Sequence, residues 1–326
     1  MKKTIVAFSR VHPSMLLPYE EKYNIILLTP EHGDIDAQFR AAIHKAHGLI
    51  GGNRRLGKVE LESAKNLEII SSISVGYDNY DLDYLNSRKV MLTNTPDVLN
   101  ETTADLAFAL ILATARRIPE LDAWVKEGGW TKSIDESQFG CDVHGKALGI
   151  IGLGKIGAAI ARRGRLGFGM SVLYSGNSRK PDLEQELGAQ YVSQEVLLRT
   201  SDFVCPVVPL TSKTRGLIGT QEFAQMKQNG ILINISRGPV VDEEALIKAL
   251  EAKAIRGAGL DVYVREPLPD SKLFKMRNVV TVPHIGSATE ETRNAMAARA
   301  LGNLLMGLEG QRPRDLVNPE VLCGNR

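Results

Sequence analysis

The 326-residue sequence is poor in cysteine, and this excludes two classes of protein. Its three cysteines, Cys141, Cys205 and Cys323, lie far apart, and no Cys-x-x-Cys or Cys/His spacing is present that would build a zinc site or a disulfide framework. The apolar stretch at residues 5–8 is shorter than the roughly 7–15 residues of a signal peptide core. We therefore expect a cytoplasmic protein in a reducing compartment.

Charge of one sign and long apolar runs are also lacking. The 40 lysines and arginines nearly balance the 38 aspartates and glutamates, for a net charge of +2, and no run of five or six like charges occurs. Such a chain has no field to attract a polyanion, so nucleic acid is not an expected partner. The longest nearly apolar run, residues 106–115, falls short of the ~18 residues that span a membrane, so we expect a buried helix there and no membrane partner.

What the sequence does have is an alternation of short apolar runs with amphipathic stretches, which is typical of parallel sheets covered by helices. The length suggests about two domains at ~150 residues each. A long helical pattern over residues 98–126, interrupted at Pro119, separates two sets of runs. The expected strands are 5–8, 24–29, 48–51, 69–75 and 90–94, then 148–151, 171–174, 203–208, 230–235, 257–262 and 279–282, with helices at 158–165, 243–252 and 290–307. We predict an α/β fold with two doubly wound parallel sheets and boundaries near residues 98 and 288.

A glycine-rich turn opens the second set of strands. Residues 147–157 read Ala-Leu-Gly-Ile-Ile-Gly-Leu-Gly-Lys-Ile-Gly, a Gly-x-Gly-x-x-Gly pattern between an expected strand and an expected helix. Gly152 would allow the tight turn, Gly154 the approach of a pyrophosphate, and Gly157 close packing of helix on strand. The pyrophosphate would lie at the helix N-terminus. The alternative is a glycine-rich turn without a ligand, but the strand-turn-helix context favours a dinucleotide cofactor.

The segment about 20 residues further on indicates which dinucleotide binds. An NAD site places Asp or Glu there for the adenosine ribose, but residues 173–180, Leu-Tyr-Ser-Gly-Asn-Ser-Arg-Lys, contain no carboxylate. Ser175 and Asn177 can donate to a 2′-phosphate, and Arg179 can pair with it through two N–H groups. We predict that NADPH is preferred and NADH possible. The alternative is that Arg179 and Lys180 only form a solvated turn.

Polar residues follow each of the last three expected strands, where open α/β sheets place ligand chemistry. Reduction of a 2-keto acid needs a cation for the carboxylate, a hydride donor and an acid for the carbonyl oxygen, and Arg237, NADPH and His284 would supply these. Glu266 beside the imidazole would favour its protonated form. Singly, each has a structural explanation: an ion pair of Arg237 with Asp242, a surface carboxylate, a packed histidine. Their joint occurrence behind a dinucleotide turn favours catalysis.

The order of these motifs resembles the D-isomer-specific 2-hydroxyacid dehydrogenase family over nearly the whole chain. The motifs are the glycine turn, Arg-Gly-Pro-Val-Val-Asp from residue 237, Gly-Leu-Asp-Val from 259 with Glu-Pro at 266, and Pro-His-Ile-Gly-Ser-Ala-Thr from 283, with local matches at 73–79 and 113–117. The sequence is most similar to the bacterial glyoxylate/hydroxypyruvate reductases that also reduce 2-ketogluconate. The resemblance implies a Rossmann NAD(P)-binding domain, residues 98–288, inserted in a flavodoxin-like substrate domain, residues 1–97 with 289–326. It also implies a homodimer formed through the nucleotide domain, with the long helical segment reaching across.

By position, the resemblance implies that Arg237 binds substrate, Glu266 supports the histidine and His284 donates the proton. It further implies that the backbone N–H groups of Val75 and Gly76 hold the substrate carboxylate and that Asp261 contacts the nicotinamide carboxamide. The remaining expected cofactor contacts are Thr103, Leu153, Lys155, Ile156, Pro209, Ile235 and Gly286.

These patterns predict NADPH-dependent reduction of small 2-keto acids, glyoxylate and hydroxypyruvate, to D-2-hydroxy acids without a metal ion. Two alternatives stay open. One is a reductase of 2-ketogluconate or another sugar acid, which would differ in the lining of the pocket. The other is a dinucleotide-sensing interaction protein, since C-terminal-binding-protein corepressors resemble this family and keep its catalytic set. The absence of a basic patch, and of a long disordered extension beyond residue 317, speaks against the second.

Overall fold

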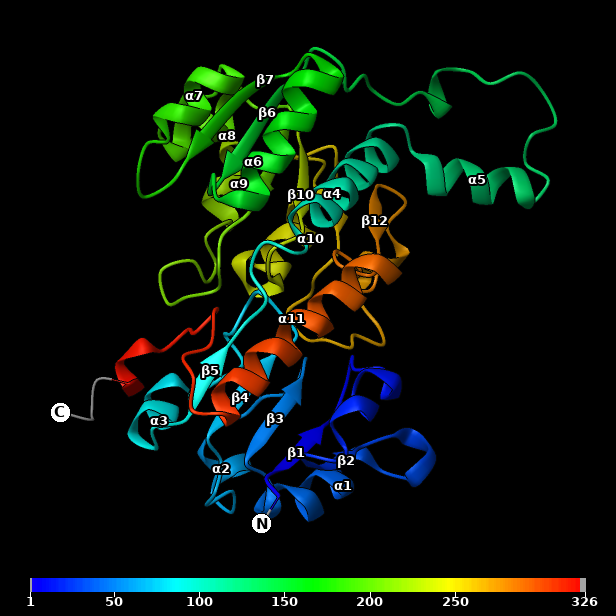
Figure 1. The fold of residues 1–326 in the computed structure, drawn as a ribbon. Helices are drawn as coiled ribbons and strands as arrows, with labels where there is room; N and C mark the ends of the chain where they lie inside the picture. The colour runs from blue at the N-terminus through cyan, green and yellow to red at the C-terminus, as the bar shows by residue number, and fades with distance from the viewer. Residues whose placement is uncertain (1, 323–326) are drawn as a thin grey trace. The chain divides into compact units, whose positions relative to one another are not determined.

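The computed structural model describes residues 2–322, which form two compact units (Figure 1). We call Met1–Leu99 with Ala288–Arg326 the split unit and Asn100–Ser287 the inserted unit. Each contains one sheet whose strands all pair in parallel. Within the described residues, no helix has the length and apolar character that crossing a membrane requires. Cys323 lies outside the described residues.

The split unit is built on a five-stranded sheet in the order β2-β1-β3-β4-β5, which is the flavodoxin-like order. Strands β1, β3 and β4 are buried along their whole length, as expected of a parallel sheet covered on both faces. The bounds are β1 Thr4–Ala7, β2 Asn24–Leu27, β3 Gly48–Gly51, β4 Ile69–Ser72, β5 Met91–Thr93, α1 Ile35–Ala42, α2 Lys58–Leu61, α3 Leu82–Ser87 and α11 Glu290–Leu308.

Helix α11 comes from the far end of the sequence and packs on β3, β4 and β5 (Figure 1). Its approach is close, because a Cβ atom on Gly307 would lie 2.5 Å from Ile69 Cδ1. The hydroxyl of Ser71 in β4 also donates to the Ala300 carbonyl at 2.6 Å. The chain therefore leaves the split unit after its fifth strand and returns to complete it.

The inserted unit has a seven-stranded sheet in the order β12-β11-β10-β9-β6-β7-β8. The order from β8 to β11 is that of the Rossmann fold, and its reversal point lies between β6 and β9. The predicted α/β class with two doubly wound parallel sheets is confirmed. The strands are β6 Ala147–Ile151, β7 Ser171–Ser175, β8 Gln190–Tyr191, β9 Phe203–Pro206, β10 Ile231–Asn234, β11 Gly257–Leu260 and β12 Val279–Thr281, and the helices are α4 Asn100–Ala115, α5 Ile118–Lys126, α6 Lys155–Arg162, α7 Pro181–Leu187, α8 Gln194–Thr200, α9 Thr220–Gln225 and α10 Glu243–Glu251.

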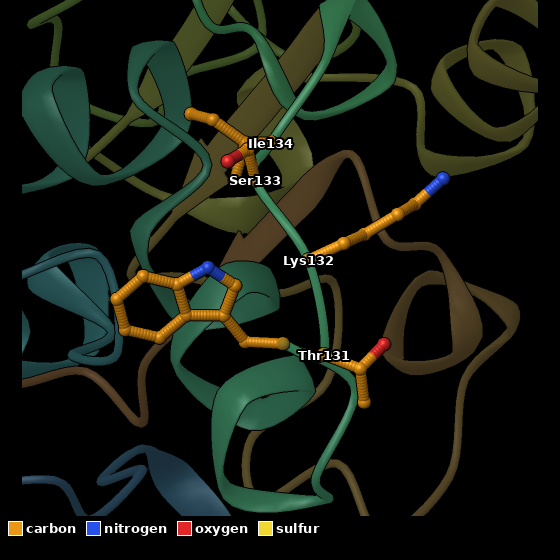
Figure 2. Close-up of a pocket in the computed structure, with 5 residues that line it drawn as sticks. Thr131, Lys132, Ser133 and Ile134 are labelled. Atoms are coloured by element: carbon orange, nitrogen blue, oxygen red, sulfur yellow. The ribbon is translucent and has the colours of Figure 1, made fainter.

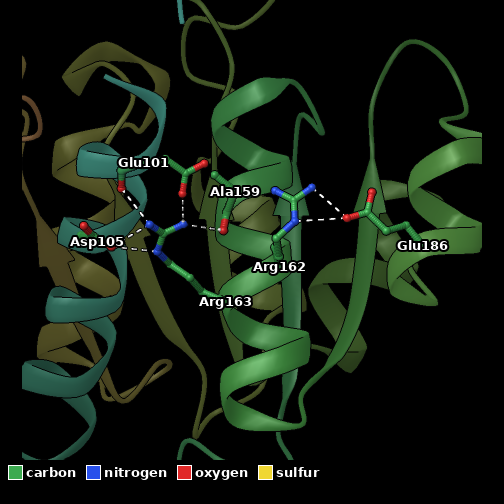
Figure 3. A network of polar contacts seen from close by, with 6 residues as sticks. All are labelled: Glu101, Asp105, Ala159, Arg162, Arg163 and Glu186. Atoms are coloured by element: carbon green, nitrogen blue, oxygen red, sulfur yellow. Dashed lines mark hydrogen bonds and ion pairs between the residues drawn. The ribbon is translucent and has the colours of Figure 1, made fainter. Parts of the chain in front are cut away.

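Helix α6, which follows the glycine turn, is fixed by ion pairs on two sides (Figure 3). Arg163 binds Glu101 and Asp105 of α4 with N–O distances of 2.7 Å, and Arg162 binds Glu186 of α7 at 2.8 Å. Each such exposed pair contributes at most about 1 kcal/mol. Packing therefore supplies most of the stability: α4 contacts α6, β10 and β11 and buries one broad face, while Glu101, Asp105 and Ala109 on its other side are exposed.

The predicted interruption at Pro119 is wrong by two residues. The long helical pattern breaks at Arg117, which has a left-handed backbone with φ of 56°. Pro119 lies in the first turn of α5, where the backbone N–H that proline lacks would have no partner within the helix. Residues 116–140, which we call the arm, extend away from the rest of the inserted unit (Figure 1). The two ends of the arm are joined, because Cys141 N donates to Ala115 O at 2.8 Å.

Candidate active site

Three neighbouring strands of the inserted unit carry the predicted catalytic residues. Strands β10, β11 and β12 are adjacent and parallel, so their carboxyl ends meet at one edge of the sheet. Arg237 follows β10, Glu266 follows β11 and His284 follows β12. Open α/β sheets bind ligands at this edge.

The structure brings Glu266 and His284 into contact. Glu266 Oε2 lies 2.5 Å from His284 Nδ1, while Oε1 accepts a hydrogen bond from Tyr263 N at 3.0 Å. An ionised carboxylate only accepts hydrogen bonds, so Nδ1 carries the proton and Nε2 is the ring nitrogen that remains to exchange a proton with a ligand. Both side chains are about one-third exposed, at 33% for Glu266 and 37% for His284. A ligand can therefore reach the pair.

Glu266 is ionised in this arrangement. Partial burial alone would raise the pKa of its carboxyl group, but the hydrogen bonds from His284 and from the Tyr263 N–H, with the nearby charge of Arg237, lower that pKa below its usual range. The charged carboxylate therefore holds the imidazole through Nδ1.

A second carboxylate fixes the loop that carries His284. Asp261 is fully buried and accepts hydrogen bonds from Ile285 N at 2.6 Å and Gly286 N at 2.9 Å. Thr103 of α4 donates to the Gly286 carbonyl at 3.0 Å. Burial raises the pKa of Asp261 to about 6. Three predicted cofactor residues, Asp261, Thr103 and Gly286, thus form one hydrogen-bonded group next to the imidazole.

Arg237 lies in a turn that the sequence analysis did not explain. Asn234 accepts from Ser236 N at 3.2 Å and donates to the Arg237 carbonyl at 3.2 Å, so its side chain folds the turn. An asparagine three residues before Arg237, at the start of the turn, is a sequence signal for such an Asx turn. A Cβ atom on Gly238 would lie 1.9 Å from the Tyr263 carbonyl, so Arg237 sits beside the residue whose N–H binds Glu266.

Two other residues near this turn, Asp242 and Ile235, have structural roles. Asp242, considered as an ion-pair partner of Arg237, caps α10 by accepting from Ala245 N at 3.1 Å. Ile235, a predicted cofactor contact, is buried between β10 and the turn.

The glycine turn has the geometry of a dinucleotide site. Gly152 has φ of 101°, and a Cβ atom on it would lie 2.5 Å from Val207 O. A Cβ atom on Gly157 would lie 2.5 Å from Gly152 O. Gly154, the N-cap of α6, is different because a Cβ atom there would meet no atom within 4 Å. The fold itself requires the first and last glycines, whereas Gly154 faces open space at a helix N-terminus, where a pyrophosphate fits.

Comparison with known proteins decides the family. The model of the D-isomer specific 2-hydroxyacid dehydrogenase NAD-binding domain matches residues 108–286. Glyoxylate/hydroxypyruvate reductase B of Escherichia fergusonii is 47% identical over 322 residues, which cover 98% of this chain and 99% of the relative. The chain belongs to the D-isomer specific 2-hydroxyacid dehydrogenases. The resemblance inferred from the motifs is confirmed, and with it the expectation of an NAD(P)-dependent oxidoreductase.

Solved structures agree with the fold of the dehydrogenase. The NADPH-dependent glyoxylate/hydroxypyruvate reductase of Sinorhizobium meliloti, crystallised with NADP and malonate, has a TM-score of 0.86 and 31% identity, covering 98% of each chain. The TT0316 protein of Thermus thermophilus has a TM-score of 0.85 and 38% identity, covering 96% of this chain and 99% of its own.

The predicted cofactor-selecting turn of the dehydrogenase follows β7. Ser175 ends the strand and is buried, and its Oγ has no hydrogen-bond partner within residues 2–322. Asn177 is exposed. Arg179 pairs with Glu184 of α7 at 2.5 Å, a partner that the sequence analysis missed because it lies beyond the turn.

The other predicted contacts occupy three places. In the glycine turn, Leu153 is buried, Ile156 is partly buried and Lys155 is exposed, and Pro209 is exposed after β9. Val75 and Gly76 belong to the split unit, in the loop after β4, where the Val75 carbonyl accepts from Asn94 Nδ2 at 2.9 Å.

A concave surface lies in the arm of the dehydrogenase. It is lined by Trp130 and by Thr131, Lys132, Ser133 and Ile134, which Figure 2 labels, and none of these is a predicted site residue. In the described part of the chain, no group of three or more His, Cys, Asp or Glu side chains is placed to hold a metal ion.

Proposed function

We propose that the dehydrogenase reduces small 2-keto acids, glyoxylate and hydroxypyruvate, to D-2-hydroxy acids with NADPH. The observation that carries this proposal is the contact of Glu266 with His284 at the sheet edge that also bears Arg237. The relatives from Escherichia fergusonii and Sinorhizobium meliloti are both named for these two substrates, which supports the choice of substrate.

The three side chains would divide the chemistry between them. Arg237 would bind the substrate carboxylate through its planar guanidinium group, and the family resemblance assigns the N–H groups of Val75 and Gly76 to the substrate as well. His284 gives the proton on Nε2 to the carbonyl oxygen as negative charge develops there. Glu266 holds the ring through Nδ1, so that Nε2 is the nitrogen left to face the substrate. The imidazole that remains is neutral and takes up its next proton from solvent.

The glycine turn and the loop that carries His284 would hold the dinucleotide. Gly152, Leu153, Gly154, Lys155, Ile156 and Gly157 surround its pyrophosphate, and Thr103, Pro209, Ile235, Asp261 and Gly286 line its nicotinamide end. When bound, the dinucleotide supplies the hydride that reduces the carbonyl carbon. The open space at Gly154 supports this placement.

The preference for NADPH rests on the turn after β7. Ser175, Asn177 and Arg179 offer donors to a 2′-phosphate, and the buried Ser175 hydroxyl is without a partner within residues 2–322. Asn177 and Arg179 are exposed and can meet a ligand directly, whereas the Ser175 hydroxyl is enclosed by the protein.

A second copy of the chain would cover the arm. Its apolar side chains are unusually exposed, at 53% for Ile118, 63% for Trp130, 56% for Ile134 and 55% for Phe139. Apolar surface of this kind marks contact with another protein, and the family resemblance makes the partner a second protomer. The free thiols of Cys141 and Cys205 suit the cytoplasm, where we place the homodimer.

A panel of substrates and cofactors on the purified enzyme tests the function. We expect kcat/KM to be higher for glyoxylate and hydroxypyruvate than for 2-ketogluconate, and higher with NADPH than with NADH. A higher value for 2-ketogluconate would make the protein a sugar-acid reductase. Dinucleotide binding without oxidation of NADPH by any 2-keto acid would make it a sensor.

A further inference from the structure

The turn that would read the 2′-phosphate is fastened by Tyr174, a fully buried residue of β7. Its hydroxyl lies 2.6 Å from Lys180 N and 2.6 Å from Glu184 Oε1. The backbone N–H only donates and the carboxylate only accepts, so the single hydroxyl proton goes to Glu184. Tyr174 therefore joins the last residue of the turn to the first part of α7.

Glu184 in turn holds Arg179. Arg179 Nε donates to Glu184 Oε1 at 3.2 Å, and Nη2 donates to Oε2 at 2.5 Å. This is the paired geometry that a guanidinium group forms with a carboxylate. The hydrogen bonds from Arg179 and Tyr174 lower the pKa of Glu184 to about 2, so the carboxylate stays charged at any working pH.

The pair leaves part of the guanidinium group exposed. The Glu184 side chain is only 17% exposed, whereas that of Arg179 is 65% exposed. Within residues 2–322, the hydrogen bonds of Arg179 use Nε and Nη2 and none uses Nη1. The Glu184 carboxylate thus lies on the covered side of the guanidinium group. The Nη1 edge of Arg179 can bind an anion that arrives from solvent.

We propose that Glu184, oriented by Tyr174, is a positioning residue that holds Arg179 for the 2′-phosphate and so sets the preference for NADPH. The inference deepens the proposed function and rests on its choice of cofactor. A free arginine side chain loses rotamer freedom when it binds a phosphate, whereas a side chain already held in place loses less. Glu184 would act through this preorganisation, without touching the cofactor.

The opposite effect is the competing interpretation. Glu184 carries a negative charge beside Arg179, and a charge of that sign repels a phosphate. If repulsion outweighed preorganisation, removal of the carboxylate would strengthen phosphate binding. The sign of the change in affinity therefore distinguishes the two.

The test uses two small ligands that share an adenosine, 2′,5′-ADP and 5′-AMP, of which only the first carries the 2′-phosphate. Calorimetric titration of the whole protein measures both dissociation constants without substrate or turnover. For Glu184→Gln we expect binding of 2′,5′-ADP to weaken about tenfold and that of 5′-AMP to change less than twofold. Tyr174→Phe should have the same pattern of effects: weaker binding of 2′,5′-ADP and little change for 5′-AMP. Glu186→Gln on the same helix, which loses only the surface pair with Arg162, is the matched control.

A double variant separates positioning from a general structural effect. In an Arg179→Ala background, Glu184→Gln should have no further effect on 2′,5′-ADP, because the residue that it positions is gone. The proposal is overturned if Glu184→Gln binds 2′,5′-ADP as tightly as the unaltered protein or more tightly, if it loses both ligands equally, or if its effect persists without Arg179.

The outcome is independent of the reaction. A protein that selects 2′,5′-ADP through Glu184 but reduces no 2-keto acid would contradict the proposed function and leave the inference standing. Equal binding of the two ligands by the unaltered protein would contradict the NADPH preference and the inference together. Glu184→Asp should weaken binding of 2′,5′-ADP as well, since the shorter side chain cannot reach both Tyr174 and Arg179.

Discussion

His284 reaches the edge of the sheet with a left-handed backbone, at φ of 52°, and its neighbours hold it there. Asp261 binds the two N–H groups that follow it, and Thr103 binds the carbonyl of Gly286. The direction of the imidazole therefore depends on a buried carboxylate as well as on Glu266. Buried groups of this kind are expensive to alter.

The stability of the protein should report on Asp261. Because burial raises its pKa to about 6, the folded protein binds a proton more tightly than the unfolded chain, so this group contributes stability below about pH 4 that is lost as the pH rises through 6. The free energy of unfolding of the unaltered protein, relative to Asp261→Asn, should thus fall between pH 4 and pH 7, by about 1.4 kcal/mol for each unit by which folding raises the pKa. Urea denaturation at both pH values measures this. A difference that stays constant or grows with pH would contradict the account.

Arg237 should matter most for capture of the substrate. Replacement by alanine removes a paired charge from the carboxylate, and we expect kcat/KM for glyoxylate to fall about 30- to 1,000-fold, mainly through KM. Arg237→Lys should recover little, because an ammonium group cannot form the paired geometry. Arg265→Ala, an exposed neighbour of Glu266, is the control. An unchanged KM in Arg237→Ala would remove the arginine from substrate binding.

At the level of elements, the three glycines before α6 serve different purposes. Gly157 has a backbone oxygen 2.5 Å from where its Cβ atom would lie, whereas Gly154 has open space. We expect Gly157→Ala to lower the free energy of unfolding by about 1–3 kcal/mol. Gly154→Ala should leave the free energy of unfolding within about 0.5 kcal/mol of the original but weaken NADPH binding, because the methyl group would occupy the proposed place of the pyrophosphate.

Urea denaturation and titration of protein fluorescence with NADPH separate the two glycine effects. Gly167→Ala, where a Cβ atom also meets nothing within 4 Å, is the control and should change neither measurement strongly. If Gly154→Ala bound NADPH as tightly as the original, the glycine turn would not be the pyrophosphate site.

Most strands could be predicted because each coincides with a short apolar run. The sequence pattern missed β8, Gln190–Tyr191, since two exposed residues give no apolar run. It placed the helix break at Pro119 because proline is the stronger local signal, whereas the break at Arg117 is a backbone conformation that no residue type demands. The same limit applies to the site. Arg237, Glu266 and His284 could be predicted because they follow strands, whereas Asn234, Tyr263 and Glu184 could not, because they depend on contacts across turns.

At the scale of the whole molecule, the alternation of strands and helices predicted two parallel sheets, and the strand orders of both follow the rules for such sheets. Self-association is harder to read from a sequence, because an exposed apolar residue resembles a buried one. Only the structure places Trp130 and Ile134 on an arm that extends from the inserted unit (Figures 1 and 2).

The arm should control assembly. We expect the unaltered protein to sediment as a dimer at micromolar concentration, and Trp130→Asp with Ile134→Asp to raise the dissociation constant at least about 30-fold, as loss of an aromatic anchor does in other interfaces. Val59→Asp is the matched control, since Val59 is 87% exposed in the split unit. Sedimentation velocity measures all three proteins. A monomer in the unaltered protein, or equal effects of the two changes, would contradict the dimer.

The central claim is that His284 donates the proton, and the turnover of His284→Ala tests it most directly. With hydroxypyruvate and saturating NADPH, loss of a general acid should lower kcat about 10²- to 10⁴-fold. The dissociation constant for NADPH, measured by fluorescence titration of the same sample, should stay within about twofold, because the imidazole has no part in holding the dinucleotide. A turnover equal to that of the unaltered enzyme, or a loss matched by an equal loss of NADPH binding, would contradict the account.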